Sequence, residues 1–550
     1  MNRNALLFIV IFIVTSCSVA TNSLVKFNEN HKKNIVLKKV KLENWVFKDY
    51  LLDTIPGISL DKAYKLVNRK KPKEIIVAII DTEIDIKHED LKGQFWVNKN
   101  EIPNNLIDDD NNGYVDDYQG WNFIGNKRGE NIIYSNLESA RIIQKFKNKF
   151  NGLSREEVQN QDTEDFDLFI KANDYFNKGY NSAIKEQDYA SFLYNGYPKA
   201  KKSVDSLFHN SKYNSKNLDS LFLIYKGKNI KLAKNIYFIS DCLKYKLTKE
   251  WIENYKEQID KKINYTYNLD YYDRKRIDSF PQILEKNKYG NKFISKNLFE
   301  FYHGTMVAGI IGAHRNNSIG VDGISSKIKM MPIAISSNGE EHDKDISLAI
   351  RYAVDNGARI INMSFGKHFS LNKKWVFEAI RYAEMNNVLI VTSAGNGDLN
   401  LNNYNDYYPN DNIDNGKEIT NNFLVVGSSS FELSSKLKSS FSNYGNIDVD
   451  IFAPGEEINT TIPNNKYKTD SGTSLSCAVV SGVAALVLSY YPNLSAPSLK
   501  KILMDSGVSY SIMINVSDKE NERINFINLS KSGKIVNAYN ALLIAKDIEL

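Results

Sequence analysis

Between residues 303 and 506, short apolar segments rich in β-branched residues alternate with longer segments whose apolar residues recur at helical spacing. A strand, a helix and the next strand in this order form the repeating unit of a parallel α/β sheet. The earlier run 74–80 is almost continuously apolar, as expected for a parallel strand covered on both faces. We therefore predict an α/β fold with a doubly wound, mainly parallel sheet. The other expected elements are 60–64, 303–312, 328–335, 346–356, 359–364, 375–386, 388–394, 423–426, 449–452, 495–506 and 536–545.

The first 16 residues carry Arg3 and an apolar core, 5–14, that is too short to cross a bilayer and is typical of a secretory signal. The sequence Val-Thr-Ser-Cys at 14–17 resembles a bacterial lipobox, in which the cysteine, here Cys17, is lipidated and becomes the N-terminus. An ordinary signal peptide with an incidental cysteine is the alternative. Because Ser18 is not acidic, the resemblance favours an outer-membrane lipoprotein, facing either the periplasm or the exterior.

Composition divides the rest of the chain. Residues 18–44 are polar and rich in Lys and Asn, which indicates a tether. From 130 to 299, Lys, Asn, Asp, Tyr and Phe dominate and Gly is scarce, so we expect a helical insertion into a domain formed by 45–129 and 300–550. The chain carries 71 basic and 65 acidic residues, spread along its length, which gives no reason to expect nucleic acid binding.

Aromatic and aliphatic residues recur at helical spacing in the insertion. We expect these stripes to form a core packed on the main domain, with a groove for a protein partner as the alternative. The residues are Ile142, Phe146, Phe150, Phe166, Phe169, Ile170 and Phe176.

Four side chains are expected at strand ends or helix starts along one sheet edge. Asp81 directly follows the strand 74–80, the place where open α/β sheets carry functional groups. His303 begins a helix of small residues, and Asn396 follows the strand 388–394. Ser474 precedes a long apolar helix, whose N-terminus favours developing negative charge. An ordinary helix cap has the same composition as the turn at Ser474. The prediction of a functional site therefore depends on the combination of all four residues.

These residue types fit nucleophilic hydrolysis. The Ser474 hydroxyl needs an imidazole to accept its proton, and His303 can do so while Asp81 holds its tautomer and stabilises the imidazolium. Asn396 and the Ser474 N–H can stabilise the oxyanion of a tetrahedral intermediate, the side-chain donor contributing roughly 3–4 kcal/mol.

The order Asp, His, Asn, Ser resembles the subtilisin-like serine peptidases, the subtilases, over roughly 45–125 and 300–545. The resemblance implies a polypeptide substrate, a chemistry that needs no cofactor, and an edge strand formed by Ser364, Phe365 and Gly366. It also implies that Ala394 and Gly395 help to wall the primary pocket. The matching blocks are Val-Ala-Ile-Ile-Asp-Thr (77–82), His-Gly-Thr-Met-Val-Ala-Gly (303–309), Ser-Ala-Gly-Asn (393–396) and Gly-Thr-Ser-Leu-Ser (472–476).

Three residues depart from the family pattern. Glu83 replaces a small Gly, which could crowd or recharge the acidic end of the triad. Ala478 replaces a proline and restores a helical N–H. Leu475 replaces a Met that often follows the serine, so we expect activity that survives peroxide.

The acidic stretch 108–117 matches the first nine positions of a calcium loop, with Asp108, Asp110, Asn112 and Asp116 as candidate ligands. Gln119 stands where the closing Glu is required, which excludes a complete EF-hand. A shorter structural Ca²⁺ site and a plain Asx-rich turn both remain open.

We therefore predict a lipid-anchored serine endopeptidase of the cell envelope. The alternative is a catalytically silent subtilase-like binding module, motivated by Glu83, Ala478 and the size of the insertion.

Overall fold

The computed structural model describes residue 24 and residues 44–208, 212–284, 288–404, 407–412, 417–516 and 522–549. The predicted signal segment, the lipidation site Cys17 and nearly all of the tether lie outside these residues.

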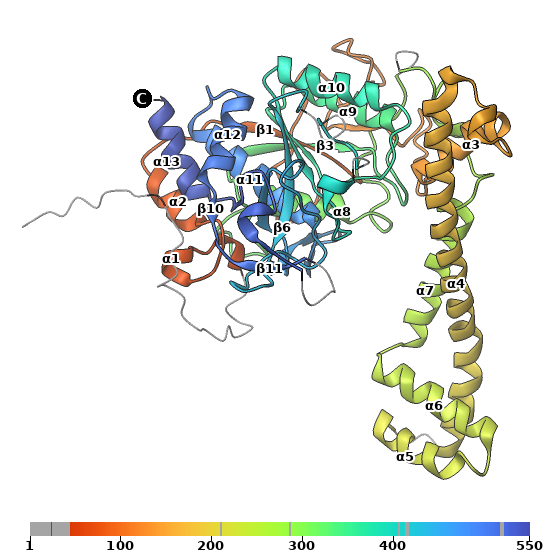
Figure 1. Cartoon of the computed structure of the whole chain (residues 1–550). Coiled ribbons are helices and arrows are strands. Elements are labelled where there is room, and N and C mark those ends of the chain that lie inside the picture. The colour runs from red at the N-terminus through yellow and green to blue at the C-terminus, as the bar shows by residue number, and fades with distance from the viewer. Residues whose placement is uncertain are drawn as a thin grey trace, which may run out of the picture.

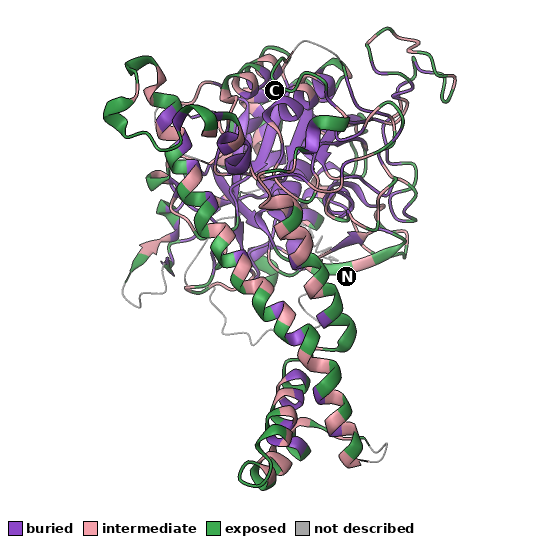
Figure 2. Ribbon diagram, turned by 90° about the vertical axis from the view of Figure 1, so that its right-hand side faces the viewer, coloured by how far each residue is buried: buried purple, intermediate pink, exposed green. Residues whose placement is uncertain are grey.

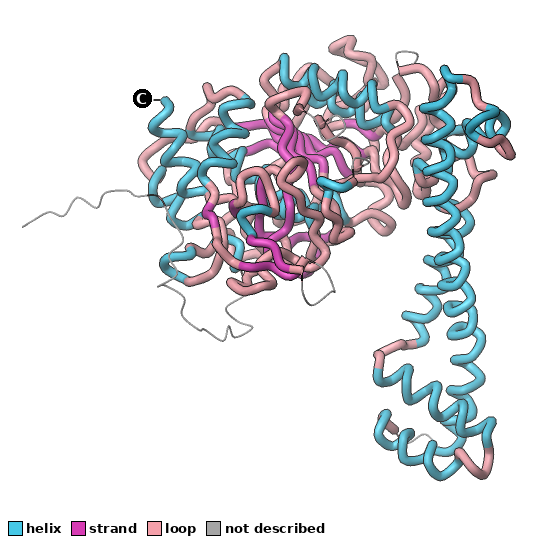
Figure 3. The backbone as a smooth tube through the Cα atoms, viewed as in Figure 1, coloured by secondary structure: helices cyan, strands magenta, loops and turns pink. Residues whose placement is uncertain are grey.

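A sheet forms the centre of the main domain (Figures 1 and 3). It has nine strands in the order β10-β13-β7-β6-β5-β4-β1-β3-β2. Neighbouring strands run parallel except for the pair β10 and β13. This is the predicted α/β sheet. Its strands are β1 (Ile75–Asp81), β2 (Trp121–Asn122), β3 (Ile328–Ala334), β4 (Ile360–Met363), β5 (Leu389–Ser393), β6 (Phe423–Ser429), β7 (Ile451–Pro454), β10 (Val508–Ser509) and β13 (Lys534–Ile535).

Helices cover both faces of this sheet (Figures 1 and 3). α8 (His303–Gly312) packs against α11 (Thr473–Tyr490) on one face, while α9 (Asp343–Asp355) and α10 (Lys373–Met385) pack together on the other. Burial on both faces explains the continuous apolar strands, and Figure 2 shows the sheet as the buried centre of the molecule. The remaining helices of this domain are α1 (Tyr50–Asp53), α2 (Leu60–Val67), α12 (Ala496–Ser506) and α13 (Ala538–Glu549).

α11 is long and apolar enough to cross a membrane by length and composition, but 89% of it is buried inside the protein. It is therefore a core helix. It begins immediately after a hairpin that the sequence patterns did not indicate, formed by β8 (Ile458–Ile462) and β9 (Lys466–Asp470). A second small hairpin pairs β11 (Met513–Asn515) with β12 (Arg523–Asn525).

The helical segment projects from the main domain as an arm (Figure 1). α4 (Thr163–Phe208) has 46 residues, which at 1.5 Å per residue gives a length of about 70 Å. α7 (Lys249–Lys261) lies beside α4, and α5 (Ser215–Tyr225) and α6 (Ile230–Lys244) form the distal end. α3 (Glu138–Phe150) packs on the proximal part of α4.

The predicted aromatic stripes form the proximal core of the arm. Ile142, Phe146 and Phe150 of α3 are buried, as are Phe166, Phe169 and Phe176 of α4, and Phe369 of the main domain joins this cluster. Ile170 was predicted to share the stripe, but its side chain is 45% exposed. Its position on α4 faces solvent because α3 and the main domain cover only one side of the helix.

Buried ion pairs fix the base of the arm to the start of α9. Lys344 binds Asp278 at 2.7 Å, and Lys367, fully buried, binds Asp343 at 2.7 Å and Glu138 of α3 at 3.4 Å. Removing one partner of such a pair leaves a buried charge without compensation, which costs about 3–5 kcal/mol. The arm is thus a fixed part of the fold at its base.

Candidate active site

Three neighbouring strands bring the predicted site residues to one edge of the sheet. β1 ends at Asp81, β4 is followed by Ser364, and β5 is followed three residues later by Asn396. Because β5, β4 and β1 are adjacent in the sheet, their carboxyl ends lie side by side. α11, which begins next to Ser474, packs across β1, β4 and β5.

Asp81 and His303 form a direct hydrogen bond. His303 Nδ1 lies 2.8 Å from Asp81 Oδ1 and 3.0 Å from Oδ2. Asp81 is 1% exposed, and Oδ1 also accepts a hydrogen bond from Thr82 N at 2.7 Å. This contact fixes the carboxylate and directs the other imidazole nitrogen, Nε2, away from Asp81.

Gly304 allows α8 to start close to β1. A β-carbon at this position would lie 2.7 Å from the Thr82 carbonyl oxygen, which no van der Waals contact allows. Gly304 N also donates to Thr82 Oγ1 at 2.9 Å. The absence of a side chain therefore places His303, the first residue of the helix, within reach of Asp81.

Burial lowers the pKa of His303, but the charge of Asp81 and its hydrogen bond outweigh burial, so the imidazole pKa lies above its ordinary value. The His303 side chain is still 34% exposed. A substrate can therefore approach an imidazole whose protonated form is stabilised by the buried carboxylate.

Two hydrogen bonds join Ser474 to Ser364. Ser474 Oγ donates to the Ser364 carbonyl oxygen at 2.9 Å, and Ser364 Oγ donates to the Ser474 carbonyl oxygen at 3.0 Å. Among the described residues, the Ser474 hydroxyl is thus bound to the end of β4 and not to His303.

Asn396 is oriented by the residue before the serine. Its Oδ1 accepts hydrogen bonds from Thr473 N at 3.0 Å and from Thr473 Oγ1 at 2.9 Å. Since the oxygen is occupied in this way, the amide nitrogen Nδ2 is left as a donor beside the start of α11. It lies 3.8 Å from the position a β-carbon of Gly472 would occupy.

Sequence patterns did not reveal the residues that hold this amide. Thr473 is completely buried and also accepts a hydrogen bond from Gly395 N at 3.1 Å. Asn443 is 1% exposed, donates to the Ala394 carbonyl at 2.8 Å and accepts from Gly397 N at 3.0 Å. Thr473 stands inside the quoted Gly-Thr-Ser block, whereas Asn443 lies in a loop with no periodicity to indicate it.

The residues predicted to bind the substrate lie beside Ser474. Ser364, Phe365 and Gly366 extend β4, and the described residues form no hydrogen bond with the backbone of Gly366. Gly395 adopts a left-handed conformation, with φ of 98°.

Glu83 does not turn toward the triad. Its buried carboxylate accepts hydrogen bonds from Asn131 Nδ2 at 2.8 Å and from the backbone N–H groups of Lys296 and Asn297. These partners lie at the two ends of the predicted insertion. Burial raises the pKa of Glu83, although the three donors oppose that change.

The other two departures lie within α11. Leu475 is 2% exposed and Ala478 is completely buried. Cys477, between them, donates to Asn362 Oδ1 at 3.2 Å, and burial raises its thiol pKa to about 12. It is a core residue.

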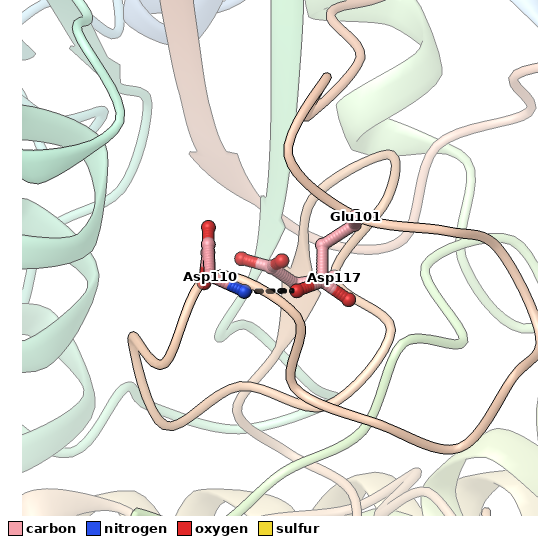
Figure 4. Close-up of side chains that lie close together, drawn as sticks. All are labelled: Glu101, Asp110 and Asp117. Atoms are coloured by element: carbon pink, nitrogen blue, oxygen red, sulfur yellow. Dashed lines mark hydrogen bonds between the residues drawn. The ribbon is translucent and has the colours of Figure 1, made fainter.

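The acidic loop gathers a different set of carboxylates from the predicted one. Glu101, Asp110 and Asp117 each place a carboxylate oxygen within 4.8 Å of the others (Figure 4). The Asp108 carboxylate instead accepts hydrogen bonds from the backbone N–H groups of Asn112 and Gly113. The other two predicted ligands are also engaged: Asp116 binds Lys292 at 2.9 Å, and Asn112 Oδ1 accepts from Tyr114 N.

This cluster offers what a hard cation needs. Glu101 is 4% exposed, and its Oε2 has no hydrogen-bond partner among the described residues. Burial raises the pKa of both Glu101 and Asp117 above the ordinary range. Buried carboxylate oxygens of this kind fit Ca²⁺, which prefers several oxygen ligands.

Serine proteases are among the known proteins to which this chain is similar. The chain is 34% identical over 188 residues to thermitase of Thermoactinomyces vulgaris, covering 34% of this chain and 61% of that protein. It is 36% identical over 191 residues to the major intracellular serine protease of Bacillus subtilis, covering 34% and 55%. The matched stretches span less than two thirds of these relatives.

Two further comparisons are with a curated relative and with a solved structure. The chain is 31% identical over 212 residues to subtilisin DY of Bacillus licheniformis, covering 38% of this chain and 70% of that protein. The crystal structure of a cold adapted subtilisin-like serine proteinase matches 43% of this chain and 74% of its own, at 26% identity and a TM-score of 0.33. The Subtilase family matches residues 72–527, which is most of the sequence. The chain therefore belongs to the subtilase family.

Proposed function

We propose that this protein is a serine endopeptidase that hydrolyses peptide bonds of polypeptides. The observation that carries the proposal is the hydrogen bond between His303 Nδ1 and the buried Asp81, at the sheet edge where Ser474 lies in the first turn of α11. Family membership supports the same activity. A silent binding module would not need a buried carboxylate that raises the pKa of an accessible imidazole.

The proposed mechanism begins with rotation of the Ser474 hydroxyl away from Ser364. His303 Nε2 takes its proton as Oγ attacks the scissile carbonyl carbon, and Asp81 stabilises the resulting imidazolium. The oxyanion accepts hydrogen bonds from Asn396 Nδ2 and from the Ser474 N–H. The imidazolium then protonates the leaving amine as the C–N bond breaks, which leaves an acyl-enzyme.

Water completes the cycle. His303 removes a proton from water as its oxygen attacks the ester carbonyl, and the same two donors stabilise the second oxyanion. Collapse of this intermediate breaks the bond to Ser474 Oγ, which regains a proton from His303. The chain's own residues supply every proton transfer in this sequence.

The test uses protein that lacks residues 1–17. The wild type should cleave casein and react with a fluorophosphonate at Ser474, and Ser474→Ala should do neither. If the wild type and Ser474→Ala behave alike in both assays, the binding module is the correct function. Thermal unfolding of both proteins shows whether the variant is folded.

We also propose that Glu101, Asp110 and Asp117 bind a structural Ca²⁺. Titration calorimetry on the inactive Ser474→Ala protein should detect binding, and adding Glu101→Gln with Asp117→Asn should abolish it. Asp116→Asn is the matched control, because Asp116 is already paired with Lys292. Loss of binding in the control but not in the double variant would mean that the ion is bound by the loop ligands instead, namely Asp108, Asp110, Asn112 and Asp116.

The lipid anchor is a further proposal, which rests on the sequence around Cys17. Cells grown with labelled palmitate should incorporate label into the wild type and not into Cys17→Ser, and the labelled protein should sediment with outer membranes. Equal labelling of both proteins, or release of the wild type into the soluble fraction, would contradict the anchor.

We propose finally that the distal end of the arm contacts a protein partner. Leu223, Ile224 and Ile230, at the junction of α5 and α6, are each more than half exposed. Cross-linking in cells from a photoreactive residue at position 224 should yield one discrete adduct. The same residue at position 385, where Met385 is exposed on the main domain, is the control. Identical patterns from both positions would contradict a specific contact.

A further inference from the structure

A slot lies next to the serine, between two glycines. Gly366 is two residues beyond Ser364, whose carbonyl accepts the Ser474 hydroxyl, and Gly395 directly precedes Asn396. The resemblance to subtilases implies that the edge strand at Gly366 pairs with the substrate and that Gly395 helps to wall the primary pocket, so the side chain of the residue that supplies the scissile carbonyl would lie between these two backbone segments.

The phenol of Tyr407 fills this slot. A β-carbon on Gly366 would lie 2.4 Å from the Tyr407 hydroxyl, and one on Gly395 would lie 2.1 Å from it. The same hydroxyl thus touches both walls at once. Burial raises the pKa of Tyr407, as expected for a phenol enclosed between backbone segments.

Neighbouring contacts hold the tyrosine in place. Its ring packs edge-on against His368, with centroids 5.6 Å apart. Its carbonyl oxygen accepts from Asn410 Nδ2 at 2.8 Å. The next residue, Tyr408, exchanges two backbone hydrogen bonds of 2.8 Å with Lys367, directly after Gly366. The ring is therefore tied to the same segment whose glycine it covers.

We propose that Tyr407 closes the primary pocket and restricts cleavage to bonds that follow a residue with a small side chain, namely Gly, Ala or Ser. The inference rests on the proposed peptidase function and adds a substrate class to it. A Phe or Leu side chain at this position would occupy the volume of the Tyr407 ring. Steric overlap of this kind is energetically unfavourable, because the atoms of a close-packed interior cannot shift far enough to relieve it.

The experiment compares two peptide substrates that differ only in Ala or Phe before the scissile bond. The wild type should favour Ala by about 100-fold in kcat/KM, the upper range for pockets that discriminate by size. Tyr407→Ala should raise kcat/KM for the Phe peptide by at least about 10-fold. Tyr407→Phe keeps the ring and should keep the preference for Ala.

Tyr404→Ala is the matched control, since Tyr404 is 51% exposed and lies in the same loop. It should leave the ratio unchanged. Fluorophosphonate labelling of Ser474 accompanies each assay and separates the two proposals. A labelled wild type that prefers Phe overturns the pocket inference alone, whatever the folding of Tyr407→Ala. A wild type that neither labels nor cleaves overturns the peptidase function and the pocket inference with it.

Discussion

The hydroxyl of Ser474 donates a hydrogen bond to the carbonyl oxygen of Ser364 at 2.9 Å, although Asp81 already holds His303 in position. The serine therefore rests against the end of β4, and attack requires a change of its side-chain torsion. We predict that a crystal structure of the phosphonylated protein shows Oγ rotated away from Ser364 and bonded to phosphorus beside Asn396. An adduct in which Oγ keeps its contact with Ser364 would contradict this movement.

The pH dependence of kcat/KM should report His303. The base must be neutral, and Asp81 raises its pKa above the ordinary value of about 6.5. Activity should therefore be lost at acid pH and should rise through a single ionisation above pH 6.5. The protonated imidazole also contributes to folding stability, and this contribution has the opposite pH dependence to kcat/KM. It is complete below the ordinary pKa of His303 and is lost as the pH rises through the raised pKa.

Asp81→Asn tests the cause of that shift. Removing the carboxylate charge should move the ionisation to lower pH and reduce kcat by about 10⁴-fold, because the amide favours the wrong imidazole tautomer. An unchanged pH profile in this variant would show that another group controls the titration. Asp470→Asn is the control, since the charge of Asp470 also raises the pKa of His303 but contributes less than that of Asp81.

Asn396 and Thr473 should behave as one unit. Asn396→Ala should lower kcat by about 10²–10³-fold with little change in KM, because the lost donor acts on the oxyanion. Thr473→Val removes the hydroxyl that binds Asn396 Oδ1 and should cost less. Adding Thr473→Val to Asn396→Ala should then have almost no further effect on kcat, whereas full additivity would mean that Thr473 acts independently.

Activity should survive peroxide. Leu475 follows the serine and has no sulfur to oxidise, and Met306 and Met363 are at most 2% exposed. Leu475→Met should make the protein sensitive, with activity falling as the new thioether is oxidised. Rapid inactivation of the wild type, with Met306 and Met363 unmodified by mass spectrometry, would contradict this explanation.

Glu83→Ala should destabilise the fold by about 2–3 kcal/mol, since it leaves buried backbone N–H groups of Lys296 and Asn297 without an acceptor. Denaturant unfolding measures the change. Glu157→Ala is the control, because Glu157 is exposed and only caps a short helix, so its loss should cost less than about 1 kcal/mol. Equal effects from both variants would mean that Glu83 does not anchor these segments.

Residue pattern predicted the sheet and the placement of the site residues because both follow local rules. A continuous apolar run predicts a buried parallel strand, and the carboxyl ends of such strands meet at one edge, so Asp81 and Asn396 were placed without knowledge of the loops. His303 and Ser474 were placed in a similar way, at the starts of apolar helices.

Contacts between distant loops could not be predicted. Tyr407 reaches the slot only because its loop pairs with Lys367, and Asn443 reaches Ala394 from about fifty residues away. The spacing of Asp108 and Asp116 matched a calcium loop, but backbone donors and Lys292 compete for these carboxylates, and Glu101 lies outside the motif. The predicted burial of Ile170 was wrong, because the spacing of apolar residues does not indicate how much of a long helix the main domain covers.

Glu83 binds residues at both ends of the inserted segment, two positions after Asp81. The segment therefore leaves the main domain and returns to it at nearly the same point. Such an element is topologically a cassette, and exchanging it for a shorter or longer one does not reroute β1 or α8. A subtilase scaffold can thus carry an arm of a different size, provided that the graft preserves the acceptor at position 83, its donors on either side of the splice, and carboxylate partners for the buried Lys344 and Lys367.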